Sequence, residues 1–142
     1  MTLKGKMVNK LIAHSLIKYH EKYLVIKRVA TSYGRNNVYP FYWDIPGGSV
    51  ESEELPKAAA VRECLEEVGL QIKIDDIIHE DSNLDNGIVY TRLVYDAHLP
   101  KNKEIIVTLN PEEHTDYRWI SDLNDLNGEK IVPYLAEILE SK

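Results

Sequence analysis

The stretch from Gly47 to Leu70 constrains the fold of this chain more than any other segment. It begins with two glycines, which allow tight turns and the close approach of another group. A helix is predicted from about Leu55 to Val68, because Pro56 suits a first helical turn and Gly69 is a typical stop. Apolar residues then recur at steps of three and four, which predicts one face packed against a core: Ala58, Val61, Leu65 and Val68.

Three glutamates, Glu63, Glu66 and Glu67, fall on the opposite side of this helix as one acidic patch. Like charges at these offsets destabilise a helix by roughly 0.2–0.5 kcal/mol per pair, and Arg62 can offset only part of this by pairing with Glu66. A solvated acidic face is the alternative reading. A cation is the more economical one, and clustered carboxylate oxygens select a hard ion, Mg²⁺ or else Mn²⁺.

The same segment resembles a family motif. Gly48, five residues, Glu54, seven residues and then the run from Arg62 to Leu70 match the Nudix box, GX5EX7REUXEEXGU, in which U is aliphatic. Every fixed letter is present at its spacing. Cys64 takes a position where Ile, Leu or Val is usual, and a small apolar residue is readily buried there. The chain therefore resembles the Nudix (MutT-like) hydrolases.

The resemblance implies an α/β/α sandwich, with a mixed β-sheet between helices. The order of predicted elements agrees, since strands occur before and after the central helix and a second helix is predicted over 131–139. Strands are predicted at 8–19, 23–29, 43–45, 71–74, 77–80, 88–99, 103–109 and 117–120, and loops at 30–40, 81–87 and 110–115. At 142 residues, the chain is expected to form one domain over 1–142.

The bulk properties narrow the partners and the compartment. A formal net charge of −6 argues against a dedicated surface for nucleic acid or anionic membranes. One cysteine excludes an internal disulfide, and the first ten residues lack the pattern of a signal peptide. We therefore expect a cytoplasmic protein, and the Nudix resemblance implies a small-molecule nucleotide substrate. A homodimer is left open, since members of the family are often dimers.

The resemblance also implies roles for individual residues. It assigns metal binding to four positions: the carbonyl of Gly48, and the side chains of Glu63, Glu66 and Glu67. It makes Arg62 the ion-pair partner of Glu54, which would hold the loop against the helix. The general base is either Glu66 or Glu67 or an acid on a later loop, where Glu113 is the main candidate beside Glu112 and His114. Ordinary solvent exposure is the alternative for a loop acid.

Substrate contacts are predicted less firmly by the residues themselves. The resemblance places Lys27 or Arg28 near phosphates, although two bases at a strand end are more often simply solvated. Tyr39 and Phe41, with Tyr33, could form a wall on which a base stacks, an interaction worth roughly 1–3 kcal/mol. The other histidines show no metal-ligand spacing and are predicted to be structural: His14, His20, His79 and His98.

Nudix enzymes hydrolyse a nucleoside diphosphate linked to another moiety by cleaving a P–O–P bridge with the help of a divalent ion. Trp119 after an acid-rich loop resembles small members that act on nucleoside triphosphates, including oxidised ones, so a MutT-like pyrophosphohydrolase is predicted. The alternatives are a hydrolase of ADP-ribose, nucleotide sugars or dinucleoside polyphosphates, and a non-catalytic nucleotide-sensing module. A sensing module would be expected to have lost a box carboxylate, and this chain retains them all.

Overall fold

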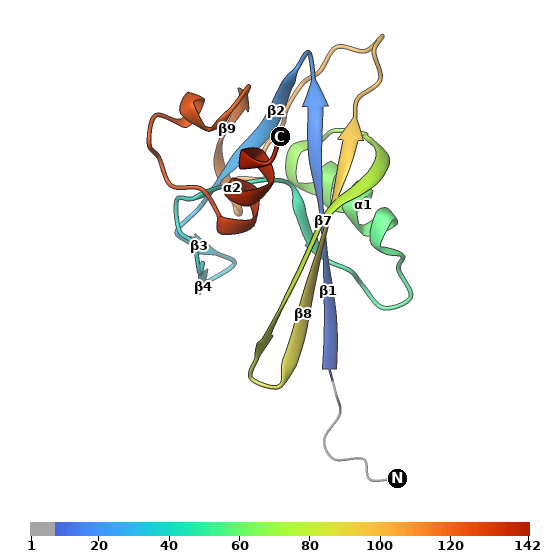
Figure 1. Ribbon diagram of the computed structural model, residues 1–142, viewed down its shortest axis with the longest axis vertical. Coiled ribbons are helices and arrows are strands. Elements are labelled where there is room, and N and C mark those ends of the chain that lie inside the picture. Colours follow the sequence, from blue (N-terminus) through green and yellow to red (C-terminus); the bar gives the residue numbers. More distant parts are fainter. Residues whose placement is uncertain (1–7) are drawn as a thin grey trace.

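A long first strand, β1 (Val8–Tyr19), forms the centre of the structure, a computed structural model that describes residues 8–142 (Figure 1). The other strands of its sheet are β2 (Lys22–Arg28), β5 (Trp43–Asp44), β6 (Gly47–Ser49), β7 (Lys73–Asp85), β8 (Ile88–His98) and β9 (His114–Ile120). The main strand order is β5-β2-β1-β8-β7, with β6 paired to β1 and β9 to β2. Strands β1 and β8 run parallel and the other pairs are antiparallel, so the sheet is mixed. A separate two-stranded sheet joins β3 (Thr31–Ser32) to β4 (Arg35–Asn36).

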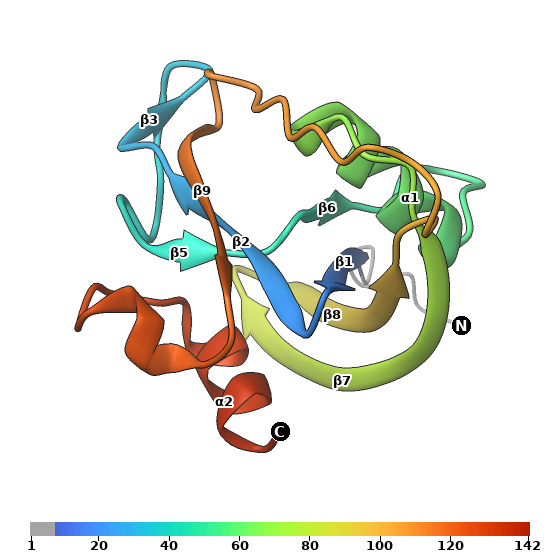
Figure 2. The ribbon, with the colours of Figure 1, turned by 90° about the horizontal axis from the view of Figure 1, so that it is seen from above.

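Two helices cover opposite sides of the sheet, as Figure 2 shows for α1 (Pro56–Val68) and α2 (Pro133–Glu140). Successive side chains of a strand point to opposite faces of the sheet, so the same strands contribute residues to a hydrophobic core under each helix. On β1, Leu16 packs toward α2 and Trp43, whereas Ile17 packs toward Cys64 and the end of α1. This arrangement confirms the predicted α/β/α sandwich, and Trp43 lies fully inside it.

Helix α1 has the predicted length but presents a different face to the sheet. The predicted stripe is wrong at Ala58, which is exposed, and at Leu65, which is 46% exposed. The buried residues are Ala59, Ala60, Cys64, Glu67 and Val68. Small side chains let the helix approach the sheet closely, with Ala59 and Ala60 packing against Ala13 of β1. The helix ends as predicted at Gly69, which has φ 71° and donates its N–H to the Leu65 carbonyl.

Three strand predictions need correction. No strand forms over 103–109, because Thr108 N–H donates to the Val68 carbonyl at the end of α1 and Asn110 N–H to that of Glu67. Residues 81–85, predicted as a loop, continue β7 in register with β8, and the turn narrows to Asn86 and Gly87, both at positive φ. Strand β9 begins at His114, three residues earlier than predicted.

Strands β1, β7 and β8 extend together as an arm beyond the helices (Figure 1). The short 3-10 helix Leu123–Leu126 precedes α2. Among residues 8–142, no helix is long and apolar enough to cross a membrane.

Candidate active site

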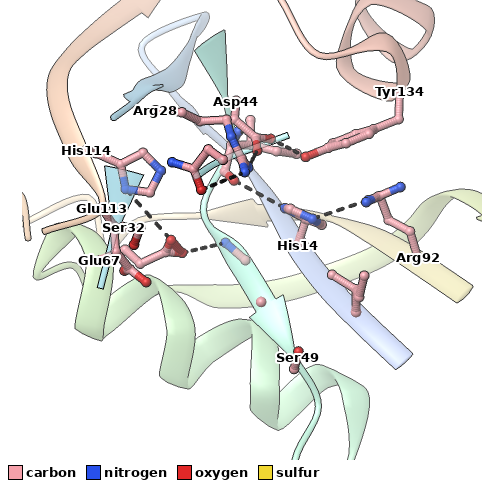
Figure 3. A pocket seen from close by; sticks show the side chains of 15 residues that line it. His14, Arg28, Ser32, Asp44, Ser49, Glu67, Arg92, Glu113, His114 and Tyr134 are labelled. Atoms are coloured by element: carbon pink, nitrogen blue, oxygen red, sulfur yellow. Dashed lines mark hydrogen bonds and ion pairs between the residues drawn. The ribbon is translucent and has the colours of Figure 1, made fainter. Parts of the chain in front are cut away.

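A cavity of about 290 Å³ lies where the end of α1 meets β6 and the start of β9. Figure 3 shows its lining: Glu67, Glu113 and His114 gather on one side, and Arg92 and Tyr134 lie on the other. The lining residues come from both sides of the central strand. The cavity therefore exists only in the assembled fold.

Glu67 is a buried carboxylate of the site, at 4% exposed. The N–H of Gly47 donates to its Oε1 at 2.8 Å, and its Oε2 lies 3.9 Å from Nδ1 of His114. Burial raises the pKa of Glu67 well above its ordinary value, and the carboxylates of Glu113 and Glu63 add to this against the Gly47 hydrogen bond. A buried carboxylate without a cation is costly, so this residue fits a site that receives a metal ion.

Gly48 lines the cavity and lies against Glu63, whose own side chain is not part of the lining. A Cβ on Gly48 would lie 2.6 Å from Cδ of Glu63 and 2.7–2.8 Å from its carboxylate oxygens. Only glycine leaves room for that carboxylate against the β6 backbone. Burial raises the pKa of Glu63, although Arg62 opposes the shift. A donor set of Glu63 and Glu67 with the Gly48 carbonyl is rich in oxygen and suits a hard divalent ion such as Mg²⁺.

Arg62 organises the acidic residues around the helix. Its Nε and Nη2 form a bidentate pair with Glu54, at 2.8 and 3.0 Å, and Nη2 also donates to the Ser49 carbonyl at 3.1 Å. Hydrogen bonds from Arg62 hold the pKa of the Glu54 carboxyl at about 2. Arg62 also donates to Glu63 and Glu66. It therefore ties the 49–54 loop to α1.

The three box glutamates differ in burial, which the reading from sequence did not predict. Glu67 is buried, Glu63 is half-buried and paired with Arg62, and the side chain of Glu66 is 56% exposed and directed at Arg62. Glu66 does not line the cavity. One turn of helix thus holds a buried carboxylate, an intermediate one and an exposed one.

Arg28 reaches the cavity because β2 changes register at its end. The pairing with β9 is irregular between Lys27 and Arg28, and such a bulge redirects side chains. The Arg28 guanidinium donates to Asp44 at 3.0 Å and to Asn37 at 3.4 Å. Burial alone would raise the pKa of Asp44, yet His14, the Tyr134 hydroxyl and Arg28 together hold it below its ordinary value. Asp44 therefore stays ionised and fixes Arg28.

A second arginine, Arg92 of β8, faces the same space. Its guanidinium lies 4.0 Å from the centroid of the Tyr134 ring and donates to Asp81 at 3.1 Å and to Nε2 of His14 at 3.4 Å. Sequence reasoning missed Arg92 and Tyr134 and treated His14 as structural, because β8, α2 and β1 are far apart in the chain. Asp44, three residues before the glycine pair, could have been noticed from its position.

The remaining candidate substrate residues are spread apart. Lys27 pairs with Glu129 at 3.0 Å and lies over the Trp43 ring, so it points away from the cavity. Phe41 is exposed and does not line the cavity. Glu113 lines it, whereas Glu112 is exposed on the same turn. Tyr39 is half-buried and lines a neighbouring cavity.

That neighbouring cavity, of about 540 Å³, shares a wall with the first. The shared residues are Ile12, Arg28, Arg92 and Tyr134. Its other walls carry two tyrosines, Tyr39 and Tyr90, and three carboxylates, Asp81, Asp85 and Glu137. The two cavities thus adjoin: carboxylates line the first, both arginines belong to the shared wall, and aromatic and acidic groups line the second.

Comparisons with known proteins identify the same family along most of the chain. The model of the NUDIX domain matches residues 11–140. A putative 8-oxo-dGTP diphosphatase 3 from Mycobacterium tuberculosis is 31% identical over 86 residues, covering 56% of this chain and 37% of that protein. Human diphosphoinositol polyphosphate phosphohydrolase 2 is 45% identical over 47 residues, covering 33% of this chain and 26% of that protein.

A solved structure agrees in fold across nearly the whole chain. The MutT protein from Methanosarcina mazei superposes with a TM-score of 0.74 at 24% identity, covering 99% of this chain and 95% of that one. The two sequence relatives are matched over only 26–37% of their own lengths. Their substrates are properties of those proteins.

Proposed function

Because this chain belongs to the Nudix family, we propose that it hydrolyses a P–O–P bond of a nucleotide with the help of Mg²⁺, or else Mn²⁺. The substrate class we favour is a nucleoside triphosphate, including an oxidised one. One observation supports this above all: the carboxylate cavity shares a wall, which includes Arg28 and Arg92, with a second cavity that Tyr39 and Tyr90 help to line.

The carboxylate end suits the reacting phosphates. A divalent ion bound there would neutralise phosphate charge and make hydroxide available from bound water. Glu63, Glu67 and the Gly48 carbonyl would hold such an ion. Glu113 is the residue we propose as acceptor of the proton from the attacking water, because burial, together with the charge of Glu66, raises the pKa of its carboxyl. A raised pKa brings a carboxylate nearer to the value useful for a general base at neutral pH.

The two arginines suit the remaining phosphate oxygens. Guanidinium groups bind phosphate through planar, paired donors. Asp44 orients Arg28, and Asp81 and the Tyr134 ring orient Arg92. Both groups are thus held in place before a substrate arrives, which reduces the side-chain entropy lost on binding.

The second cavity suits a nucleoside more than another polyphosphate. Tyr39 and Tyr90 offer ring surfaces for a base, and carboxylates accept hydrogen bonds from its N–H groups. The carboxylates Asp81, Asp85 and Glu137 would repel a highly charged inositol polyphosphate. This charge pattern is the reason for preferring a nucleotide.

The proposal is tested by a product-release screen with Mg²⁺ and with EDTA. The panel contains nucleoside triphosphates, 8-oxo-dGTP, ADP-ribose, diadenosine polyphosphates, nucleotide sugars and a diphosphoinositol polyphosphate. We expect metal-dependent hydrolysis of the triphosphates. Turnover confined to the inositol compound would contradict the nucleotide assignment. No turnover, with a nucleotide still raising the melting temperature, would favour the sensing module.

A substitution of Arg92 tests whether this residue of the shared wall contacts the substrate. Arg92→Ala is expected to raise KM for the nucleotide at least tenfold with a smaller change in kcat, because a hydrogen bond to a charged group contributes about 1.5–3 kcal/mol. Arg92→Lys, which keeps the charge but loses the planar contact with Tyr134, should fall between. Arg118→Ala is the matched control, since Arg118 pairs with Glu129 outside both cavities. An unchanged KM in Arg92→Ala would exclude this contact.

Two further expectations stay predictions, one domain over 1–142 and a cytoplasmic location, and the possibility of a homodimer stays open. Gel filtration with light scattering would measure the oligomeric state directly.

A further inference from the structure

One buried side chain at the site has a free ligand atom. His114, the first residue of β9, is 6% exposed, and its Nδ1 has no hydrogen-bond partner within residues 8–142. A buried, unpartnered ring nitrogen is unfavourable unless something binds it. Figure 3 shows the ring turned toward Glu67 and Glu113. The atom therefore faces the carboxylates rather than the apolar core.

The neighbouring atoms lie at a separation that one ion could bridge. Ligand atoms of Glu67, Glu113 and His114 all lie within 4.8 Å of one another. Two ligands bound about 2.1 Å from one ion are about 3 Å apart at a right angle and about 4.2 Å apart across the ion. The 3.9 Å from Nδ1 of His114 to Oε2 of Glu67 falls in that interval and is too long for a hydrogen bond.

The imidazole is also in the protonation state that a ligand requires. Burial lowers the pKa of His114 to about 4; Asp44 opposes this shift, whereas Arg28 and His14 reinforce it. The ring is therefore neutral near pH 7, with a lone pair on one nitrogen. Glu67 and Glu113 supply the negative charge.

We infer that His114 is a nitrogen ligand of the metal site and gives this enzyme a preference for Mn²⁺ over Mg²⁺. Magnesium selects oxygen ligands almost exclusively, whereas imidazole suits transition-metal ions. The inference rests on the proposed function, because it concerns the ion that the same carboxylates would hold. A nitrogen ligand would distinguish this metal site from one built from oxygen donors alone.

Metal binding to the full chain tests the inference without any substrate. The protein is titrated with each ion. Calorimetry gives the affinity for Mg²⁺ and for Mn²⁺, and the electron paramagnetic resonance signal of free Mn²⁺ gives the Mn²⁺ affinity independently. We expect Mn²⁺ to bind at least tenfold more tightly than Mg²⁺. Electron spin-echo spectra of the Mn²⁺ complex should show nitrogen modulation from an imidazole. Labelling the histidines with ¹⁵N should change that modulation, which identifies the ligand type without any substitution.

The His114→Gln variant then identifies the residue. We expect its Mn²⁺ affinity to fall at least tenfold and its nitrogen modulation to vanish, with the Mg²⁺ affinity changed less than threefold. His98→Gln is the matched control, because His98 is exposed at the end of β8 and pairs with Asp75. Nitrogen modulation that is absent from the wild type, or that persists in His114→Gln, would overturn the inference.

The outcomes separate this inference from the proposed function. Nucleotide hydrolysis with either ion, but with no nitrogen modulation, would remove the ligand role of His114 and leave the function standing. A nitrogen modulation that depends on His114, with no hydrolysis of any nucleotide, would support the ligand and remove the function.

Discussion

Glu67→Gln is expected to lower kcat by about a thousandfold while the fold stays intact. The carboxylate is held inside the cavity by the Gly47 N–H and faces both Glu113 and His114. Glutamine has nearly the same shape and can still accept from Gly47, but it supplies neither the charge for a metal ion nor a basic oxygen. Loss of either role costs about 10²–10⁴ in rate when a group acts on a proton in the transition state.

The same variant should be at least as stable as the wild type when metal is removed. Burial raises the pKa of Glu67, so the folded state resists ionising this group more than the unfolded state does. In EDTA, the wild type is therefore expected to lose stability as pH rises from the ordinary glutamate pKa through the raised one. Glutamine cannot ionise, and this loss should be absent. Thermal melts between pH 4 and pH 8 measure it.

Glu140→Gln is the matched control for Glu67→Gln. Glu140 is exposed at the end of α2, far from the cavity lining, so the same chemical change should alter neither turnover nor the pH dependence of melting. A Glu67→Gln variant that keeps near-normal Mg²⁺-dependent turnover would contradict the catalytic assignment. A Glu67→Gln variant that melts well below the wild type in EDTA would contradict the prediction that ionised Glu67 destabilises the metal-free fold.

Turn and helix-end residues in the sequence predicted where helices and strands lie. They did not predict which face of α1 packs against the sheet. Pro56 and Gly69 bounded α1, and Asn86-Gly87 marked the β7–β8 turn. The face of α1 was wrong because counting apolar residues favours Leu65, while Glu67 is drawn inward by Gly47. A charged residue that the site requires to be buried has no hydrophobic signature. Periodicity therefore misplaces it.

Long-range pairing accounts for the rest of what sequence could not predict. Arg92 enters the site because β8 lies parallel to β1, which sets Arg92 opposite Ile12 and beside His14. Tyr134 arrives from α2 on the far side of the sheet. Residues 103–109 alternate like a strand but find their hydrogen bonds at the end of α1. A spacing motif within one segment carries no information about such partners.

Gly48→Ala is expected to reduce metal-dependent kcat at least a hundredfold with little effect on folding. A Cβ there would overlap the Glu63 carboxylate, at 2.6–2.8 Å. That carboxylate is the end of a flexible side chain, so it can move aside at little conformational cost, and the backbone need not shift. The displaced carboxylate then no longer lies against Gly48 at the cavity wall. The rise in melting temperature on adding Mg²⁺ should shrink along with the turnover.

Gly87→Ala is expected to show the opposite signature and serves as the control. At the tip of the β7–β8 turn, a Cβ would meet nothing within 4 Å, but φ is 75°. Alanine in this left-handed conformation costs roughly 1–2 kcal/mol. The Gly87 variant should therefore melt earlier and retain wild-type turnover, whereas the Gly48 variant should keep its melting temperature and lose turnover. In this pair of variants, alanine at position 48 introduces a steric contact and alanine at position 87 introduces backbone strain. Equal turnover in the two variants would therefore show that the contact between Gly48 and Glu63 does not position a catalytic carboxylate.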